Sequence, residues 1–137
     1  MQNFHNELGD CLRTGFLDKS FSAKRDYLPQ LLVNDKSRNE KVLTTIEKEL
    51  DNCDEFYFSV AFVTKSGVAA IINTLKDLEE RRIRGKIVVS QYQNFTEPEA
   101  LKALIRFRNI EVKIVTEGNF HSKAYIFRKG PSYHVVI

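Results

Sequence analysis

Apolar residues recur along the chain with two spacings, and their order predicts helices that alternate with strands. A spacing of three or four residues predicts an amphipathic helix, whereas short apolar or alternating runs predict strands. Helices are expected near the N-terminus and from positions 37, 66 and 96, and strands at 56–63, 86–90, 110–116, 120–127 and 133–137. This order predicts an α/β fold, with a mixed, mostly parallel β-sheet flanked by helices and joined by right-handed crossovers.

Local signals refine the ends of these elements. Ser37 with Glu40, and Thr96 with Glu99, have the spacing of a capping box, in which two otherwise unpaired amides at a helix start are satisfied. Pro98 would lie in the first turn, where its missing N–H does no harm. The run FYFSVAFV at 56–63 is apolar at nearly every position, so we expect a strand that is covered on both faces.

The first 36 residues carry a weaker pattern than the rest of the chain. Phe4, Leu8 and Cys11 recur at helical spacing, so residues 1–36 are predicted to form a helix followed by an irregular arm. Residues 37–137 are predicted to form the α/β part of a single structural domain. The last apolar strand reaches Ile137, and we therefore expect the chain to be truncated within a longer protein.

Composition narrows the cellular setting. The 137 residues carry a net charge of +3, and no apolar run approaches the roughly 20 residues that span a bilayer. The polar N-terminus has no signal-peptide core, so we expect a cytoplasmic protein without a membrane partner. Cys11 and Cys53 belong to no metal-ligand pattern and are predicted to be buried thiols. We expect neither a metal nor another cofactor.

The sharpest candidate for chemistry is the segment FHSKAYIF at 120–127, which contains a His-x-Lys pair. Because side chains alternate along a strand, His121 and Lys123 are expected to project from one face, followed by Tyr125 and Phe127. An imidazole can attack phosphorus to form a phospho-His intermediate, and a second imidazole can protonate the leaving oxygen. A Lys ammonium neutralises charge on the non-bridging oxygens. The alternative is a surface His beside a solvated Lys.

The surroundings of this pair resemble the phospholipase D superfamily, whose HxK signature lies on a central strand. Three other segments, TGFLD at 14–18, SVAFVTKSG at 59–67 and YQNFTEPEALKAL at 92–104, look like the N-terminal HKD domain of bacterial superfamily II DEAD/DEAH-box helicases. The resemblance covers nearly the whole chain. It implies a phospholipase D-like half-domain, nucleic acid as the ligand, DNA before RNA, and a helicase motor that follows this segment and binds ATP.

The resemblance also implies how the site would be completed. Two HxK motifs face each other in that superfamily, and this chain carries one, so we expect a homodimer in which one His is the nucleophile and its mate the general acid. The family motif continues to an Asp where this chain has Arg128. The downstream Gly-Ser-x-Asn element would fall beyond Ile137. We therefore expect this chain alone to be weakly active or inactive.

Weaker candidates follow the second predicted strand. Ser90, Tyr92 and Asn94 are predicted to bind substrate, because ligands of open α/β sheets favour the carboxyl ends of strands. Tyr92 or Phe95 has a ring that could stack on a base. The alternative is a packed loop with one aromatic plug.

Two short basic clusters have two interpretations. They can contact a nucleic-acid backbone, or they can be solvated helix ends where positive charge suits the helix dipole. The clusters consist of Arg81, Arg82, Arg84 and Lys86, and of Arg106 and Arg108.

His5 and His134 are isolated in the sequence and are interpreted as structural residues.

Two functions emerge from these patterns. The first is a metal-independent phosphodiesterase of the nuclease type that acts through a phospho-His intermediate on His121. The alternative is a catalytically inactive module of a helicase that binds nucleic acid or forms dimers, which Arg128 in place of the motif Asp favours.

Overall fold

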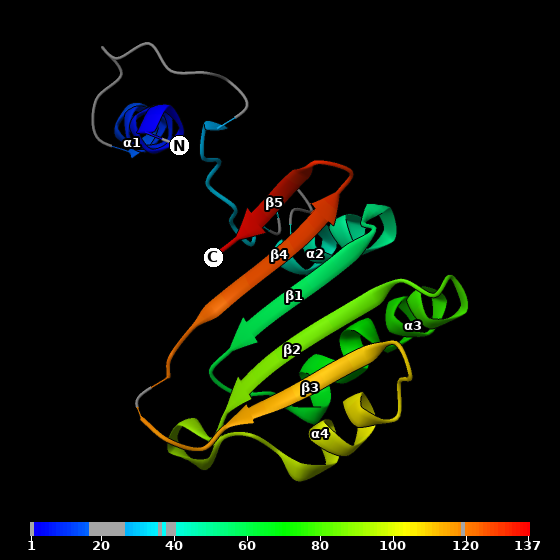
Figure 1. Cartoon of the computed structure of the whole chain (residues 1–137). Helices are drawn as coiled ribbons and strands as arrows, with labels where there is room; N and C mark the ends of the chain where they lie inside the picture. Colours follow the sequence, from blue (N-terminus) through cyan, green and yellow to red (C-terminus); the bar gives the residue numbers. More distant parts are fainter. Residues whose placement is uncertain (1, 17–26, 36, 38–40, 119) are drawn as a thin grey trace. The chain divides into compact units, whose positions relative to one another are not determined.

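A computed structural model describes residues 2–16, 27–35, 37, 41–118 and 120–137 (Figure 1). The chain divides into two compact units, Met1–Val42 and Leu43–Ile137. The first unit contains the predicted N-terminal helix as α1, Gln2–Phe16. Cys11 on this helix is fully buried, in agreement with the sequence.

The remaining elements follow the expected alternation of helices and strands, and the predicted α/β class is confirmed. They are α2 (Val42–Asn52), β1 (Glu55–Val60), α3 (Lys65–Glu80), β2 (Arg84–Ser90), the short 3-10 helix η2 (Tyr92–Asn94), α4 (Pro98–Ile105), β3 (Ile110–Val115), β4 (Lys123–Lys129) and β5 (Ser132–Val136).

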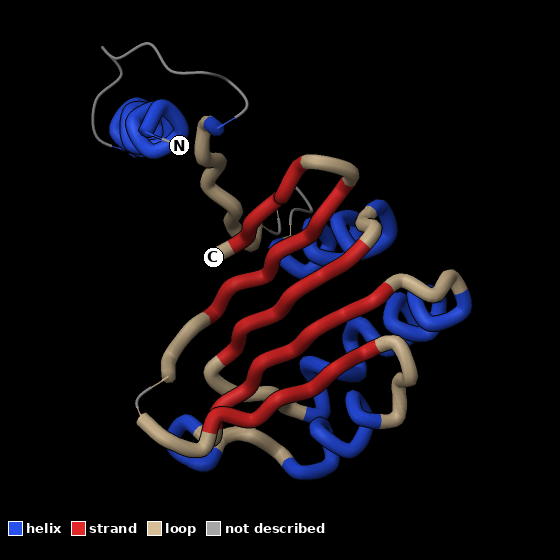
Figure 2. Tube along the Cα trace, viewed as in Figure 1, coloured by secondary structure: helices blue, strands red, loops and turns tan. Residues whose placement is uncertain are grey.

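The five strands form one mixed sheet in the order β3-β2-β1-β4-β5 (Figure 2). β1, β2 and β3 are parallel, whereas β4 pairs with β1 and β5 pairs with β4 in antiparallel fashion. The expectation of a mostly parallel sheet is therefore wrong, because half of the pairings are antiparallel. Only residues 116–122 join β3 to β4, and a parallel strand needs a crossover of about a dozen residues or more.

The helices of the second unit cover one face of the sheet. Phe56, Phe58 and Val60 of β1 are buried, and they alternate with half-buried residues on the opposite face. α3 connects β1 to β2, and α4 connects β2 to β3. Both connections are parallel crossovers that advance in the same direction along the sheet, which places both helices on the same side. The expected burial of the 56–63 strand on both faces is seen in full only on the helix side, because the residues of the opposite face are half-buried.

A close contact in this core joins β1 to β2. Phe56 pairs with Gly85, and its ring lies directly over the glycine. A Cβ added to Gly85 would lie 2.0 Å from Cζ of Phe56, which no packed structure tolerates. The strand predicted to begin at position 86 begins at Arg84, and Gly85 lies inside β2 because a strand position without a side chain makes room for the ring.

The start and the end of α3 are both fixed by hydrogen bonds that backbone N–H groups donate. The Thr64 hydroxyl accepts a hydrogen bond from the Gly67 N–H at 3.1 Å and caps the first turn. At the other end, the Arg82 N–H donates to the Glu79 carbonyl and the Ile83 N–H donates to the Leu78 carbonyl, which is the Schellman pattern. Arg82 has a left-handed φ of 59°, a conformation that favours glycine.

Neither predicted capping box forms as expected. α2 begins at Val42, whose N–H donates to Oδ1 of Asn34 at 3.0 Å, whereas the Ser37 hydroxyl donates to Asp35. Glu40 lies outside the described residues. α4 begins at Pro98 without a side-chain cap, because the Thr96 hydroxyl donates to the Ser90 carbonyl instead.

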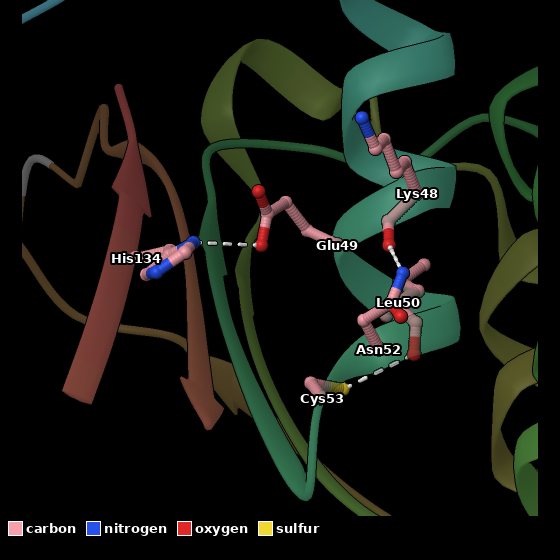
Figure 3. Close-up of polar contacts among 6 residues, drawn as sticks. All are labelled: Lys48, Glu49, Leu50, Asn52, Cys53 and His134. Atoms are coloured by element: carbon pink, nitrogen blue, oxygen red, sulfur yellow. Dashed lines mark hydrogen bonds and ion pairs between the residues drawn. The ribbon is translucent and has the colours of Figure 1, made fainter. Parts of the chain in front are cut away.

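One side-chain contact joins α2 to the antiparallel half of the sheet (Figure 3). Nδ1 of His134 on β5 lies 3.0 Å from Oε2 of Glu49 on α2, which agrees with a structural role for this histidine. The Cys53 thiol donates to the Leu50 carbonyl, and burial raises the pKa of this thiol. Cys53 is a buried, free cysteine, as the sequence predicted.

Within the described residues, no helix combines the length and apolar character needed to cross a bilayer.

Replacing Gly85 with Ala should lower the free energy of unfolding by about 1–3 kcal/mol, because the new methyl group overpacks against Phe56. Urea denaturation followed by circular dichroism measures this change. Gly9→Ala is the control, since a Cβ there meets nothing within 4 Å and Ala favours the α1 helix. A Gly85→Ala variant as stable as the wild type would contradict the packing of Phe56.

Replacing Arg82 with Gly should raise the free energy of unfolding by about 0.5–1 kcal/mol. The left-handed conformation costs a residue with a side chain about 1–2 kcal/mol, and the added chain entropy of Gly offsets part of the gain. Arg81→Gly is the matched control and should be destabilising, because Arg81 has a helical φ of −77°. Thermal unfolding of the two variants should shift the midpoint in opposite directions.

Candidate functional site

The carboxyl ends of the parallel strands meet at one edge of the sheet, and the start of β4 lies at the same edge (Figure 1). β1 ends at Val60 and β2 ends at Ser90, and Val60 pairs with Lys123 at the start of β4. Ligands of open α/β sheets bind outside this edge. The sheet therefore brings the His-x-Lys segment and the candidates after β2 to one edge, which we call the carboxyl edge.

His121 and Lys123 differ in their backbone setting. His121 precedes β4, and Lys123 is the first residue of the strand, so the prediction that both project from a strand is wrong for His121. Both residues are exposed. Lys123 shares its strand face with Tyr125 and Phe127, and exposure falls along this row until Phe127 is 1% exposed. The His-x-Lys pair thus marks the point where a core-facing row of side chains reaches solvent.

The Ser90 hydroxyl connects three segments at the carboxyl edge. Its Oγ lies 2.7 Å from the Ala61 carbonyl oxygen and 3.0 Å from that of Phe120, next to His121. Ser90 is the one buried polar residue of the core in the described part of the chain, with 4% exposure. Such a hydroxyl holds backbone in place, so Ser90 positions the segment before His121 and has little surface left for a ligand.

The other predicted substrate-binding residues lie in the turn after β2. Tyr92 begins η2, but its side chain lies outside the described residues. Asn94 is exposed, with a left-handed φ of 58° and an N–H that donates to Gln91. The Phe95 ring packs edge-on against Phe62 with centroids 5.6 Å apart, yet Phe95 keeps 52% of its surface exposed. The contact with Phe62 agrees with the interpretation of Phe95 as an aromatic plug, while about half of the Phe95 surface is open to a ligand.

A carboxylate occupies the nearby start of α3. Oε2 of Glu97 accepts a hydrogen bond from the Lys65 N–H at 2.6 Å, while the Glu97 N–H donates to the Val63 carbonyl at 2.9 Å. Helix N-termini attract anions because their amides are unpaired and the dipole is positive there. Glu97 therefore takes the place that a phosphate oxygen could otherwise fill, and it ties the two loops together.

Arg128 stands at the opposite end of β4 from Lys123. Its Nε lies 3.3 Å from Oε2 of Glu55, its cross-strand partner, and Glu55 also raises the pKa of Tyr57 by accepting its hydrogen bond. Arg128, at the position where the resemblance implies an Asp, is thus part of a part-buried ion pair. The sequence had no signal for this pairing, because Glu55 and Arg128 meet only through the antiparallel register.

An apolar cavity of about 260 Å³ lies beneath the same edge, between the sheet and helices α2 and α3. Phe58, Val68 and Tyr125 contribute to its walls, and burial raises the pKa of the Tyr125 hydroxyl.

Among the residues that the structure describes, no three His, Cys, Asp or Glu side chains gather as metal ligands would. The two basic clusters lie elsewhere, around the start of β2 and the start of β3.

Replacing Ser90 with Ala should lower the free energy of unfolding by about 1–3 kcal/mol, because buried carbonyl oxygens lose their donor. Hydrogen exchange should also become faster at residues 120–123, which Ser90 holds in place. Ser132→Ala, at an exposed position of β5, is the control and should leave both quantities unchanged. Unaltered exchange at 120–123 in Ser90→Ala would show that the hydroxyl does not position this segment.

Comparisons with known proteins leave the family open, because no protein-family model matches the chain and no curated protein matches it significantly.

Proposed function

We propose that the chain is a phospholipase D-like module that engages nucleic-acid phosphodiesters, with DNA as the preferred ligand, through His121 and Lys123. The observation that carries the proposal is the exposure of this pair at the carboxyl edge, next to the segment that Ser90 anchors. A bound phosphate would meet an imidazole and an ammonium group within three residues of chain. In a longer protein, the module would deliver a helicase motor to its substrate.

The reaction that suits these residues is metal-independent phosphodiester hydrolysis in two displacements. A ring nitrogen of His121 attacks phosphorus while the bond from phosphorus to the leaving oxygen breaks, and a second imidazolium gives its proton to that oxygen. Water then attacks the phospho-His, returns a proton to the second imidazole and releases the phosphate monoester. Lys123 stabilises the charge on the non-bridging oxygens.

A second copy of the chain would supply the second imidazole. The other histidine of the second unit is His134, and its ring is held by Glu49 on α2. A two-fold dimer that joins two carboxyl edges would place one His121 on each side of a phosphate. Each copy would then act as nucleophile or as general acid.

A non-cleaving docking module is the second candidate, and the setting of Arg128 favours it. Arg128 stands where the motif of the resembling family has an Asp, and its ion pair with Glu55 gives it a structural role. Such a module would keep Lys123 as a phosphate contact and use the fold to bind nucleic acid without reaction. Binding would then fall steeply with salt, as it does for contacts to phosphates.

The test is cleavage of labelled single-stranded and duplex DNA in EDTA by the full-length protein, with wild type compared with His121→Ala. The proposed reaction predicts cleavage by wild type and a loss of at least about 10³-fold in His121→Ala, since removal of a nucleophile leaves little of the rate. Mass spectrometry of wild type quenched during turnover should detect the phospho-His adduct on His121. His5→Ala is the matched control for loss of an imidazole.

Three results discriminate between the candidates. Cleavage that EDTA abolishes, or that survives in His121→Ala, would overturn the phospho-His reaction. Salt-dependent binding without cleavage, weakened in Lys123→Ala but not in Lys48→Ala, would establish the docking module. Absence of both binding and cleavage at low salt would reject both candidates.

A further inference from the structure

The structure brings the two basic clusters together in one open groove at the end of the sheet opposite the carboxyl edge. The groove has a volume of about 980 Å³ and lies where β2 and β3 begin. Gly85 pairs with Ile110 at its floor, which places the turn after α3 beside the turn after α4. Its positive side chains are those of Arg82, Arg84, Lys86, Arg106 and Arg108.

The charge of this groove is not neutralised by the protein. Five cations and two acids, Glu79 and Glu111, line it, so the groove carries a net charge of +3, which equals that of the whole chain. Oε1 of Glu79 already accepts a hydrogen bond from the Arg108 N–H, and Glu111 pairs with Lys113. Within the described residues, none of the five cations forms an ion pair with a carboxylate.

Two backbone-directed contacts hold the walls of the groove in place. The Asn109 side chain donates from Nδ2 to the Ile83 carbonyl at 2.6 Å, and the Gly85 N–H donates to the Asn109 carbonyl at 2.9 Å. These contacts join the turn that carries Arg82 to the turn that carries Arg108. The positive charges are therefore presented from a fixed frame, which lowers the entropy that a ligand must offset on binding.

Arg82 adds an independent observation. Its left-handed φ of 59° is one that glycine adopts without cost, so the fold would be more stable with glycine there. A side chain kept in a strained backbone setting is a feature of binding sites. Arg82 is exposed and lines the groove, so its guanidinium is presented there from a position that glycine would favour.

We infer that this groove binds the phosphate backbone of a nucleic acid. Four of its five cations are guanidinium groups, which pair with phosphate oxygens through two parallel hydrogen bonds. The cations are spread over two chain segments, 82–86 and 106–108, which suits a polymer of regularly spaced charges. The lining offers Ile110 as its one large apolar residue in the described chain, so the apolar anchors that a protein interface needs are lacking.

The inference stands apart from the function proposed for His121, because it requires binding but no reaction. The two can fail separately. Loss of cleavage in His121→Ala concerns the carboxyl edge, whereas loss of binding in groove variants concerns the opposite end of the strands.

The experiment measures binding of a fluorescein-labelled duplex of about 20 base pairs by anisotropy, over a range of salt concentrations. The double variant Arg106→Ala/Arg108→Ala should bind roughly tenfold more weakly at low salt, and its slope of log K against log salt should fall by about 2, or 0.9 for each lost phosphate contact. Arg82→Gly should also bind more weakly while its unfolding midpoint does not fall. The second variant excludes misfolding as the cause of weaker binding.

Lys48→Ala and Lys76→Ala are matched controls that remove one exposed positive charge outside the groove. Wild-type binding by the groove variants would overturn the inference, as would an equal loss in the lysine controls, which would reflect net charge alone. Poly-glutamate is the competing probe. If it binds with the same affinity and the same dependence on Arg106 and Arg108, the groove is selective for acidic polymers in general and the assignment to nucleic acid is wrong.

Discussion

The packing of Phe56 over Gly85 determines where everything else in the second unit can lie. The ring fills the space that a side chain on β2 would occupy, so β1 and β2 can pair in only one register. A shift by one residue would turn Phe56 and Phe58 away from the helices. Because β1 is also the strand on which β4 pairs, this contact sets the position of Lys123 at one end of the sheet and of Arg128 at the other.

The order of helices and strands could be predicted from the sequence because it depends on local periodicity. The helix starts could not, because polar side chains found partners that only the fold brings near. Thr96 has the spacing of a cap, yet its hydroxyl donates to the Ser90 carbonyl, and Asn34 reaches the first amide of α2 from eight residues away. The antiparallel half of the sheet was signalled by the short 116–122 connection, which leaves no room for a crossover helix.

The part of the candidate site that lies in one continuous segment of the chain could be predicted from the sequence. His121 and Lys123 are two positions apart in the sequence, so their pattern was visible without the fold. The contacts of Ser90 could not be predicted, because a hydroxyl after a strand looks the same in the sequence whether it faces solvent or two carbonyl groups. The basic groove was divided between two clusters that each look like a solvated helix end. Only the pairing of Gly85 with Ile110 unites them.

The length of β2 has a consequence for any nucleic acid that touches both ends of the sheet. The strand runs from Arg84 in the groove to Ser90 at the carboxyl edge, and six steps of about 3.3 Å separate these ends by roughly 20 Å. This distance equals about six base steps of 3.4 Å along a DNA helix. Because the strand is rigid, it would fix the distance between the two ends of the sheet. A phosphate that reaches His121 would then lie a fixed number of nucleotides from the phosphates held in the groove.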